Sequence, residues 1–253
     1  PPTGPRRARM THVGRRFTNS RKVRLGDVDP RGRLRLDAMA RYLQDLSNDD
    51  TVDAGIEDAQ TWVVRRVALH IERWPRLSER LDMATWCSGL GGRWAERSTT
   101  LGDAVHAAAL WVFVDPKTFL PARLPPGFMD VWAEAAQGRK VRARLTHDDP
   151  PADGVTWTAW PLRATDHDVL DHMNNAAYWV PVEEQLAPGG AWAGRTITEA
   201  EIEYRVPVTP GQSVLVGAAD DGRLWLRSGG NDREGGDSEG GDGDVIHASV
   251  VAR

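Results

Sequence analysis

Two short acidic segments, Arg24-Leu-Gly-Asp27-Val-Asp29 and Arg163-Ala-Thr-Asp166-His-Asp168, decide the fold because they repeat at one spacing. The arginine and both aspartates of the first segment recur in the second, each 139 residues further along the chain. A strand-like run precedes each segment, and a helical pattern followed by several alternating strands comes after it. A supersecondary unit that occurs twice in this order predicts two similar halves. We therefore expect an α+β protein in which each half is an antiparallel sheet wrapped around one helix.

Hydrophobic periodicity supplies the expected elements. Apolar and polar residues alternate over 66–72, 81–88 and 201–208, which is typical of antiparallel strands with one buried face. Residues 107–114 are continuously apolar, like a central strand, and Asp115-Pro116 ends them. Helical spacing of apolar residues predicts a helix over 34–45. A weaker helical pattern covers 172–186, where Pro181 breaks or kinks the helix unless it lies in the first turn.

Changes in composition predict the domain boundaries. The first residues are basic and rich in proline, and a basic, turn-rich stretch separates the two halves. A Gly/Asp-rich segment of low complexity interrupts the last strands and is typical of a flexible hairpin loop. The expected parts are a flexible extension (1–11), an N-terminal half (12–133), a linker (134–155) and a C-terminal half (156–253) with a flexible loop at 228–244.

Composition excludes several classes of function. A net charge of −4 gives no positive field that attracts nucleic acid or an anionic membrane. No apolar run approaches the roughly 20 residues of a membrane-spanning helix, and the basic N-terminal residues lack the apolar stretch of a signal peptide. Cys87 is the single cysteine, so no internal disulfide forms, and its strand-like context favours a small buried hydrophobe. We expect a soluble, cytoplasmic protein.

The second segment lies in a longer motif, Asp166-His-Asp168-Val-Leu-Asp-His172-Met-Asn174-Asn175-Ala-Ala-Tyr178. This motif is similar to the Asp-x-Asp-x-x-x-His-x-Asn-Asn-x-x-Tyr signature of hotdog thioesterases. The first segment, in Leu25 to Gly32, resembles the corresponding loop of 4-hydroxybenzoyl-CoA thioesterase. Similarity to plant and bacterial acyl-ACP thioesterases extends from about residue 17 to 215, through Leu43-Gln44-Asp45, Trp62 to Arg66, Asp82 to Trp86, Trp111-Val112 and Glu203-Tyr204-Arg205. The resemblance implies a tandem (double) hotdog fold and hydrolysis of a fatty-acyl thioester, as in fatty acid biosynthesis.

Thioester hydrolysis needs a nucleophile or an activated water, and donors for the oxyanion that forms on the carbonyl. We expect Asp168 to be the catalytic carboxylate, with support from His172. A helix that starts within 172–175 would offer free backbone N–H groups, and Asn174 and Asn175 would cap it or position the water. The alternative interpretation is that Asp168 only caps the helix and His172 packs in the core. No cofactor and no metal is expected, because the five-residue spacing of His167 and His172 suits neither helical nor strand pairing of two ligands.

The first segment differs from the second in one informative way. It keeps Asp29 but has Arg33 where the second has His172, so we expect a salt bridge between Asp29 and Arg33. By analogy with fused hotdog enzymes, the N-terminal half would shape the acyl-chain tunnel and carry no chemistry. The chain also departs from the plant enzymes, which have an Asn, a Glu and a Cys where Leu170, Pro207 and Val208 stand here. A cysteine nucleophile is therefore excluded.

Two other functions remain open at this point. Hotdog hydratases resemble Gly-Asp-x-Asn-Pro-x-His, but here Gly26 to Gly32 has an Asp for the Asn and a glycine for the His. A non-catalytic protein that binds acyl thioesters would explain the three departures. The expected partner is an acyl carrier protein or CoA, for which Arg15-Arg16 and Arg139 to Arg144 are basic candidates. Acyl chain length, the carrier and the oligomeric state, monomer or homodimer, stay undetermined.

Overall fold

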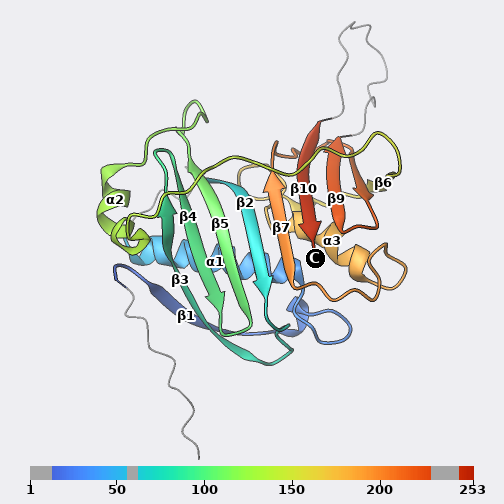
Figure 1. Ribbon diagram of the computed structural model, residues 1–253, viewed down its shortest axis with the longest axis horizontal. Coiled ribbons are helices and arrows are strands. Elements are labelled where there is room, and N and C mark those ends of the chain that lie inside the picture. The colour runs from blue at the N-terminus through green and yellow to red at the C-terminus, as the bar shows by residue number, and fades with distance from the viewer. Residues whose placement is uncertain (1–12, 56–61, 229–244) are drawn as a thin grey trace, which may run out of the picture.

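The structure, a computed structural model, describes residues 13–55, 62–228 and 245–253. The expected N-terminal extension and all but the first residue of the Gly/Asp-rich loop lie outside the described residues. The strands are β1 (Phe17–Lys22), β2 (Trp62–Ile71), β3 (Arg80–Leu90), β4 (Trp94–Leu101), β5 (Val105–Phe113), β6 (Thr156–Trp160), β7 (Glu199–Tyr204), β8 (Val214–Ala218), β9 (Arg223–Ser228) and β10 (Ile246–Ala252). They form one antiparallel sheet in the order β1-β3-β4-β5-β2-β7-β10-β9-β8-β6 (Figure 1).

The strand order is the same in both halves. The N-terminal half reads β1-β3-β4-β5-β2, and the C-terminal half, counted from its own outer edge, reads β6-β8-β9-β10-β7. The halves meet at the centre of the sheet, where β2 and β7 pair antiparallel with Val67 opposite Ile202. The expected tandem hotdog fold, built from a repeated unit, is confirmed.

Helix α1 (Leu36–Asp53) packs against the sheet of the N-terminal half and buries Leu36, Met39 and Leu46. It runs eight residues beyond the expected end at Asp45. The helical spacing of apolar residues stops at Asp45 because the last turns of α1 place a charged residue, Asp50, in the interior. Asp50 is fully buried, and its carboxylate accepts hydrogen bonds from the guanidinium groups of Arg15 and Arg97. The paired carboxylate lets a polar sequence remain helical inside the protein.

The second helical region is shorter than expected. Helix α3 covers only Val180–Leu186, after a 3-10 turn at Ala177–Trp179, and Pro181 lies in its first turn, where proline is tolerated. The expectation that residues 172–175 start a helix is wrong. These residues stay in a loop because Met173 donates its N–H to Val208, outside the segment.

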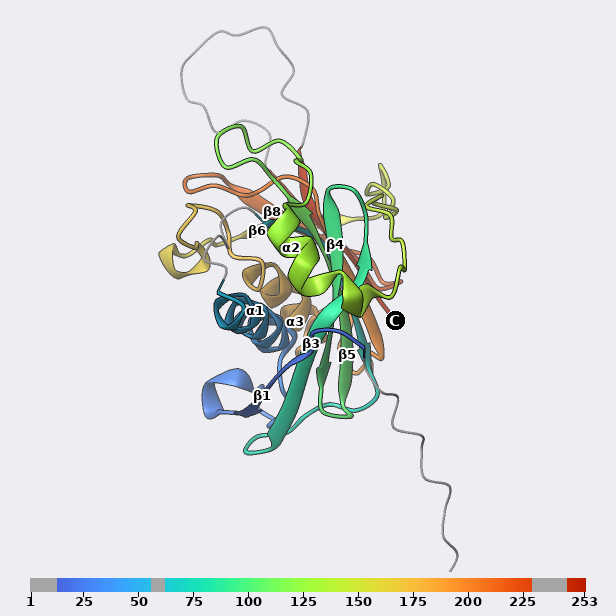
Figure 2. The same ribbon diagram turned by 90° about the vertical axis from the view of Figure 1, so that its left-hand side faces the viewer.

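The chain between the halves crosses the face of the sheet opposite α1 and α3 (Figures 1 and 2). The expected linker begins with a 3-10 turn at Glu134–Ala136. Helix α2 (Pro126–Trp132), which the sequence did not predict, precedes this turn at the end of the expected N-terminal half. Both bury apolar residues in a second small core beside β3. Strand β7 also ends at Tyr204, short of the expected residue 208, because the chain turns there toward the second loop.

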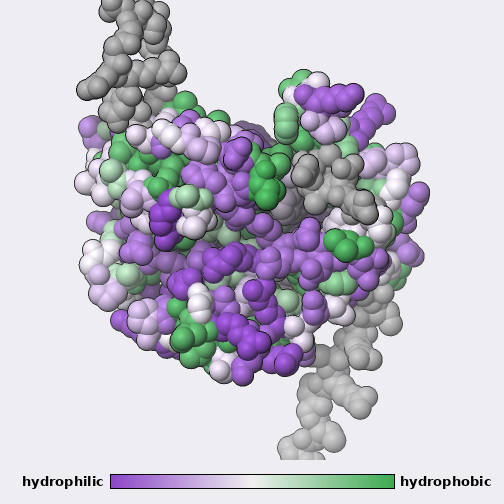
Figure 3. Space-filling view, turned by 180° about the vertical axis from the view of Figure 1, so that it is seen from behind, coloured by the Kyte–Doolittle hydropathy of each residue, from purple (hydrophilic) through white to green (hydrophobic). Residues whose placement is uncertain are grey.

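The helical face of the molecule is mainly hydrophilic, with apolar residues in small separate groups (Figure 3). Among the described residues, no helix is long and apolar enough to cross a membrane. Cys87 is buried in β3, and burial raises the pKa of its thiol above the usual range.

The main hydrophobic core lies between the sheet and the helices, and the two acidic loops lie beside this layer.

Candidate active site

The two acidic loops have the same backbone geometry. Matching hydrogen bonds recur at the 139-residue offset. In the first loop they are Arg24 N to Asp27 Oδ2 (3.0 Å), Asp29 N to Arg33 O (2.8 Å), Arg31 N to Asp29 Oδ1 (2.9 Å) and Arg35 N to Asp27 O (3.0 Å). Their counterparts in the second loop, in the same order, are Arg163 N to Asp166 Oδ2 (2.9 Å), Asp168 N to His172 O (2.9 Å), Leu170 N to Asp168 Oδ1 (2.9 Å) and Asn174 N to Asp166 O (2.8 Å). Asp29 and Asp168 are therefore equivalent positions in one repeated loop.

The side chains of the first loop neutralise one another. Arg33 forms the expected salt bridge, with its Nε 2.9 Å from Oδ2 of Asp29, and its guanidinium also stacks over the ring of Trp74. The other carboxylate oxygen of Asp29 accepts the backbone N–H groups of Arg31 and Arg33. Burial acts to raise the pKa of Asp29, but the hydrogen bonds and charge of Arg33 outweigh it and hold the pKa below its usual value. Both oxygens of this carboxylate therefore have hydrogen-bond partners within the loop.

Glu183 from α3 binds the remaining polar groups at the first loop, the guanidinium of Arg33 and the backbone N–H of Leu36. One carboxylate oxygen accepts the backbone N–H of Leu36, the first residue of α1, at 2.6 Å, and the other pairs with Arg33 at 2.5 Å. Burial of the side chain raises the pKa of Glu183, opposed by the charge of Arg33. A carboxylate of one half thus occupies the anion-binding N–H of the other half. Sequence reasoning missed Glu183, because the residues that it contacts lie about 150 positions away in the chain.

The second loop leaves the equivalent groups unoccupied by protein. Only Oδ1 of Asp168 accepts a hydrogen bond, from Leu170 N–H, and no described residue bonds Oδ2. The N–H of Asn175, equivalent to that of Leu36, likewise has no partner among the described residues. A free carboxylate oxygen and a free N–H therefore belong to the same loop.

Tyr178 lies close to this carboxylate. Burial raises the pKa of the Tyr178 hydroxyl to about 12, and the charge of Asp168 adds to the increase. The hydroxyl accepts the N–H of Val208 at 3.1 Å, and the ring packs edge-on against Tyr204 at 5.3 Å. Tyr204 in turn donates to the carbonyl of Asn175 at 2.9 Å. These contacts fix the loop from the side of β7.

The other predicted site residues take different places. His172 is half-buried, and its imidazole bonds no described residue. Asn174 makes a local turn, because its Oδ1 accepts the N–H of Ala176 at 2.9 Å, just before the 3-10 turn. Leu170, where the plant enzymes have Asn, is partly exposed at the tip of the loop. Val208, where they have Cys, is buried and accepts the N–H of Met173.

An apolar cavity lies next to the second loop, between α1 and the sheet of the N-terminal half. Its wall includes Leu43 of α1, Val67 of β2, Ala109 of β5 and, from the other half, Asn175 and Tyr204. Its volume is about 30 Å³, enough to hold a water molecule. An acyl chain that enters here must move the side chains of α1 and the sheet apart. The expectation that the N-terminal half shapes the acyl-chain tunnel stays a prediction.

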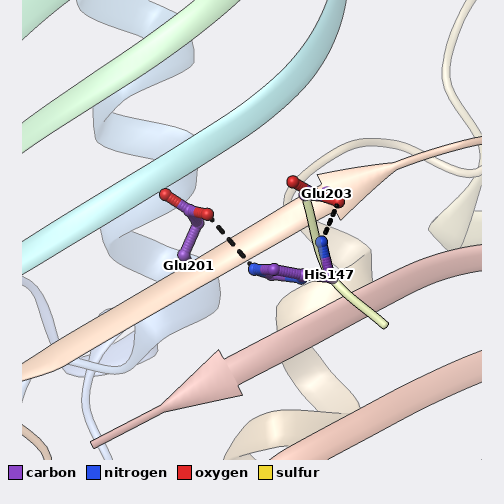
Figure 4. A group of neighbouring side chains, drawn as sticks. All are labelled: His147, Glu201 and Glu203. Carbon is purple, nitrogen blue, oxygen red and sulfur yellow. Dashed lines mark hydrogen bonds and ion pairs between the residues drawn. The ribbon is translucent and has the colours of Figure 1, made fainter. Parts of the chain in front are cut away.

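A cluster of potential metal ligands lies on the opposite face of the sheet. His147, Glu201 and Glu203 place ligand atoms within 4.8 Å of one another (Figure 4). Both oxygens of Glu203 already accept backbone N–H groups, from Thr146 at 2.6 Å and His147 at 3.0 Å. The His147 ring faces Glu201 at 3.2 Å and Ser249 at 3.1 Å. These contacts fasten the linker to β7, so the cluster has a structural role.

Three of the basic residues that were candidates for the carrier, Arg15, Arg16 and Arg139, make contacts within the chain. Arg15 pairs with Asp50 and Asp53 at 2.6 Å each, and Arg139 pairs with Glu96. The guanidinium of Arg16 stacks over Trp86, 4.2 Å from the ring centroid. These residues stabilise the N-terminal half.

The chain matches sequence models of both acyl-ACP thioesterase domains, the N-terminal domain over residues 14–132 and the C-terminal domain over 151–227. It belongs to the acyl-ACP thioesterase family. A protein of Mycobacterium tuberculosis whose function is uncharacterized is 28% identical over 208 residues, 79% of this chain and 81% of that protein. The palmitoyl-acyl carrier protein thioesterase of Arabidopsis thaliana is 26% identical over 160 residues, 57% of this chain and 37% of the plant protein.

Solved structures of the family share the fold. The 12:0-ACP thioesterase of Umbellularia californica matches with a TM-score of 0.71 at 17% identity, over 94% of this chain and 97% of its own. An acyl-ACP thioesterase of Bacteroides thetaiotaomicron matches with a TM-score of 0.68 at 17% identity, over 94% and 98%. The double hotdog architecture of this acyl-ACP thioesterase family member is thereby confirmed.

Proposed function

We propose that the chain hydrolyses the thioester of a fatty acyl group carried on acyl carrier protein or CoA, with its chemistry in the second acidic loop. The observation that carries the proposal is the difference between two otherwise equivalent loops. In the first, Arg33 and Glu183 occupy the carboxylate and the anion-binding N–H. In the second, the carboxylate of Asp168 and the N–H of Asn175 remain for a substrate.

The first loop indicates where the negative charge of the reaction would lie. The carboxylate oxygen of Glu183 is 2.6 Å from the N–H of Leu36, within the range of charge-assisted hydrogen bonds. In the second loop, the thioester oxygen would take this place on the N–H of Asn175. A donor in this position stabilises the oxyanion more than the uncharged carbonyl, which accelerates the reaction. The acyl chain would then extend into the cavity beside Asn175.

Asp168 supplies the basic group of the reaction. As a general base it takes a proton from water, while the water oxygen bonds to the carbonyl carbon and the C–S bond breaks. The departing thiolate takes the proton, so the products are a fatty acid and the free thiol of the carrier. The hydrogen bond from Leu170 N–H to Oδ1 orients the carboxylate and leaves Oδ2 for the proton transfer. His172, in the same loop, would support this carboxylate.

A panel of acyl-ACPs and acyl-CoAs of different chain lengths tests the proposal, with the release of free thiol followed by a colorimetric thiol reagent. We expect thiol release with at least one carrier and a dependence on chain length. A panel that binds to the protein but releases no thiol would refute hydrolysis.

That negative outcome would favour a second candidate, a non-catalytic protein that binds acyl thioesters. Its supporting observation is that Leu170, Pro207 and Val208 replace polar residues of the plant enzymes. The hydratase alternative loses support, because Gly32 stands where hydratases have their histidine. Its φ of 76° lies in the left-handed region, which a β-carbon disfavours. An enoyl thioester added to the panel tests this alternative, because a hydratase would consume its double bond without releasing thiol.

A further inference from the structure

Gln44 of α1 is the counterpart of Glu183 in the repeat. The offset of 139 residues that relates Asp29 to Asp168 and Leu36 to Asn175 also relates Gln44 to Glu183. Since Glu183 reaches from the C-terminal half to the N–H of Leu36, the repeat places Gln44 so that it reaches from the N-terminal half toward the N–H of Asn175. Gln44 and Asn175 indeed line the same cavity.

The side-chain oxygen of Gln44 is buried and has no hydrogen-bond partner among the described residues. Most other polar side chains that line the cavity are satisfied within the protein. Ser47 donates to Leu43 O at 2.8 Å, and Thr99 shares a hydrogen bond with Thr85 at 3.0 Å. The indole N–H of Trp111 also lacks a partner, but it is a donor. The Gln44 oxygen is therefore a buried acceptor, and leaving it unpaired costs about 1–3 kcal/mol.

We propose that Gln44 is a catalytic residue that holds the hydrolytic water. Both halves would then contribute residues to the active site, Gln44 from the N-terminal half and Asp168 and Asn175 from the C-terminal half. This inference rests on the proposed thioesterase function. The Gln44 oxygen accepts one proton of the water in a hydrogen bond, and Asp168 removes the other. The water oxygen bonds to the thioester carbon, whose oxygen lies on the N–H of Asn175, and the C–S bond breaks. The thiolate takes the proton from Asp168.

The difference in charge between the equivalent residues Glu183 and Gln44 explains why the backbone N–H is covered in the first loop and left without a protein partner in the second. Glu183 is ionisable, pairs with Arg33 and covers the N–H of Leu36. Gln44 carries no charge, so it competes less well for the N–H of Asn175 and leaves this donor to the substrate. A carboxylate at position 44 would close the second loop as Glu183 closes the first.

Three variants of full-length protein test this inference with the best substrate of the thioester panel. Gln44→Leu removes the acceptor at similar size, so kcat should fall about 10²-fold while KM changes little, because a transition-state contact is lost. Gln44→Glu should lower kcat at least as much, because the new carboxylate covers the oxyanion donor. Asn48→Leu, an amide-to-leucine change on the exposed face of the same helix, is the control and should keep both constants. Equal kcat in Gln44→Leu and wild type would overturn the inference.

The Asn175 amide provides a readout that does not depend on turnover. In the ¹⁵N–¹H spectrum of Gln44→Glu, the resonance of Asn175 should shift strongly and titrate with the new carboxyl group, whereas in the wild type it should not. An Asn175 resonance that is unaffected by Gln44→Glu would place Gln44 away from the loop and refute the inference, even if no thioester is hydrolysed. If Asp168→Asn retains full activity while Gln44→Leu loses it, the assigned base is wrong and the role of Gln44 stands.

Discussion

Glu183→Ala should destabilise the protein by about 2–4 kcal/mol, because two buried groups lose their partner at once. The side chain is 8% exposed and links α3 to the first loop. Its removal leaves the buried N–H of Leu36 unpaired, which costs about 1–3 kcal/mol. It also leaves Arg33, which is 18% exposed, with Asp29 as its remaining acid partner. Loss of one member of a buried ion pair is destabilising in its own right.

Urea unfolding followed by circular dichroism measures this effect. The midpoint should fall while the slope with urea concentration stays the same, since the surface exposed on unfolding does not change. Glu184→Ala is the matched control, because the neighbouring glutamate is exposed and should change stability by less than about 0.5 kcal/mol. Equal stabilities of Glu183→Ala and Glu184→Ala would refute the view that a carboxylate of one half closes the loop of the other.

Three further predictions concern charges and thiols. Asp29→Asn should lower stability at pH 7 by about 1–2 kcal/mol. Because the folded-state pKa of Asp29 is depressed, this difference should be present above the carboxyl pKa of the unfolded chain and vanish as pH falls through the folded value, in unfolding curves at graded pH. Thioesterase activity should survive a strong chelator; complete loss that added zinc restores would contradict the structural role given to His147, Glu201 and Glu203. The native protein should resist thiol alkylation, measured by mass spectrometry, since Cys87 is buried with a raised pKa; rapid alkylation would show that β3 opens.

The tandem fold could be predicted from the sequence because the repeat constrains both halves at once. Strand alternation marked β2 and β3 within a few residues, and the offset of Asp29 and Asp168 identified equivalent loops. The helix ends were harder to predict. The end of α1 depends on buried Asp50, whose arginine partners come from distant segments. Helix α2 is stabilised by a local core that no periodicity in its seven residues reveals.

The candidate site was only partly accessible from the sequence. The salt bridge of Arg33 with Asp29 was predictable, since the two residues are four apart in one loop. Glu183 was not found, because its contacts with the first loop link residues about 150 positions apart, which a local motif cannot show.

The most direct test of the carboxylate assignment compares Asp168→Asn with Asp29→Asn at equivalent positions of the repeat. Asparagine keeps the oxygen that accepts Leu170 N–H, so the loop should keep its shape, but it cannot take a proton from water. We expect kcat of Asp168→Asn to fall at least about 10²-fold with little change in melting temperature, and Asp29→Asn to retain most of its kcat. Near-wild-type kcat for Asp168→Asn, or loss of kcat in Asp29→Asn alone, would contradict a carboxylate mechanism in the second loop.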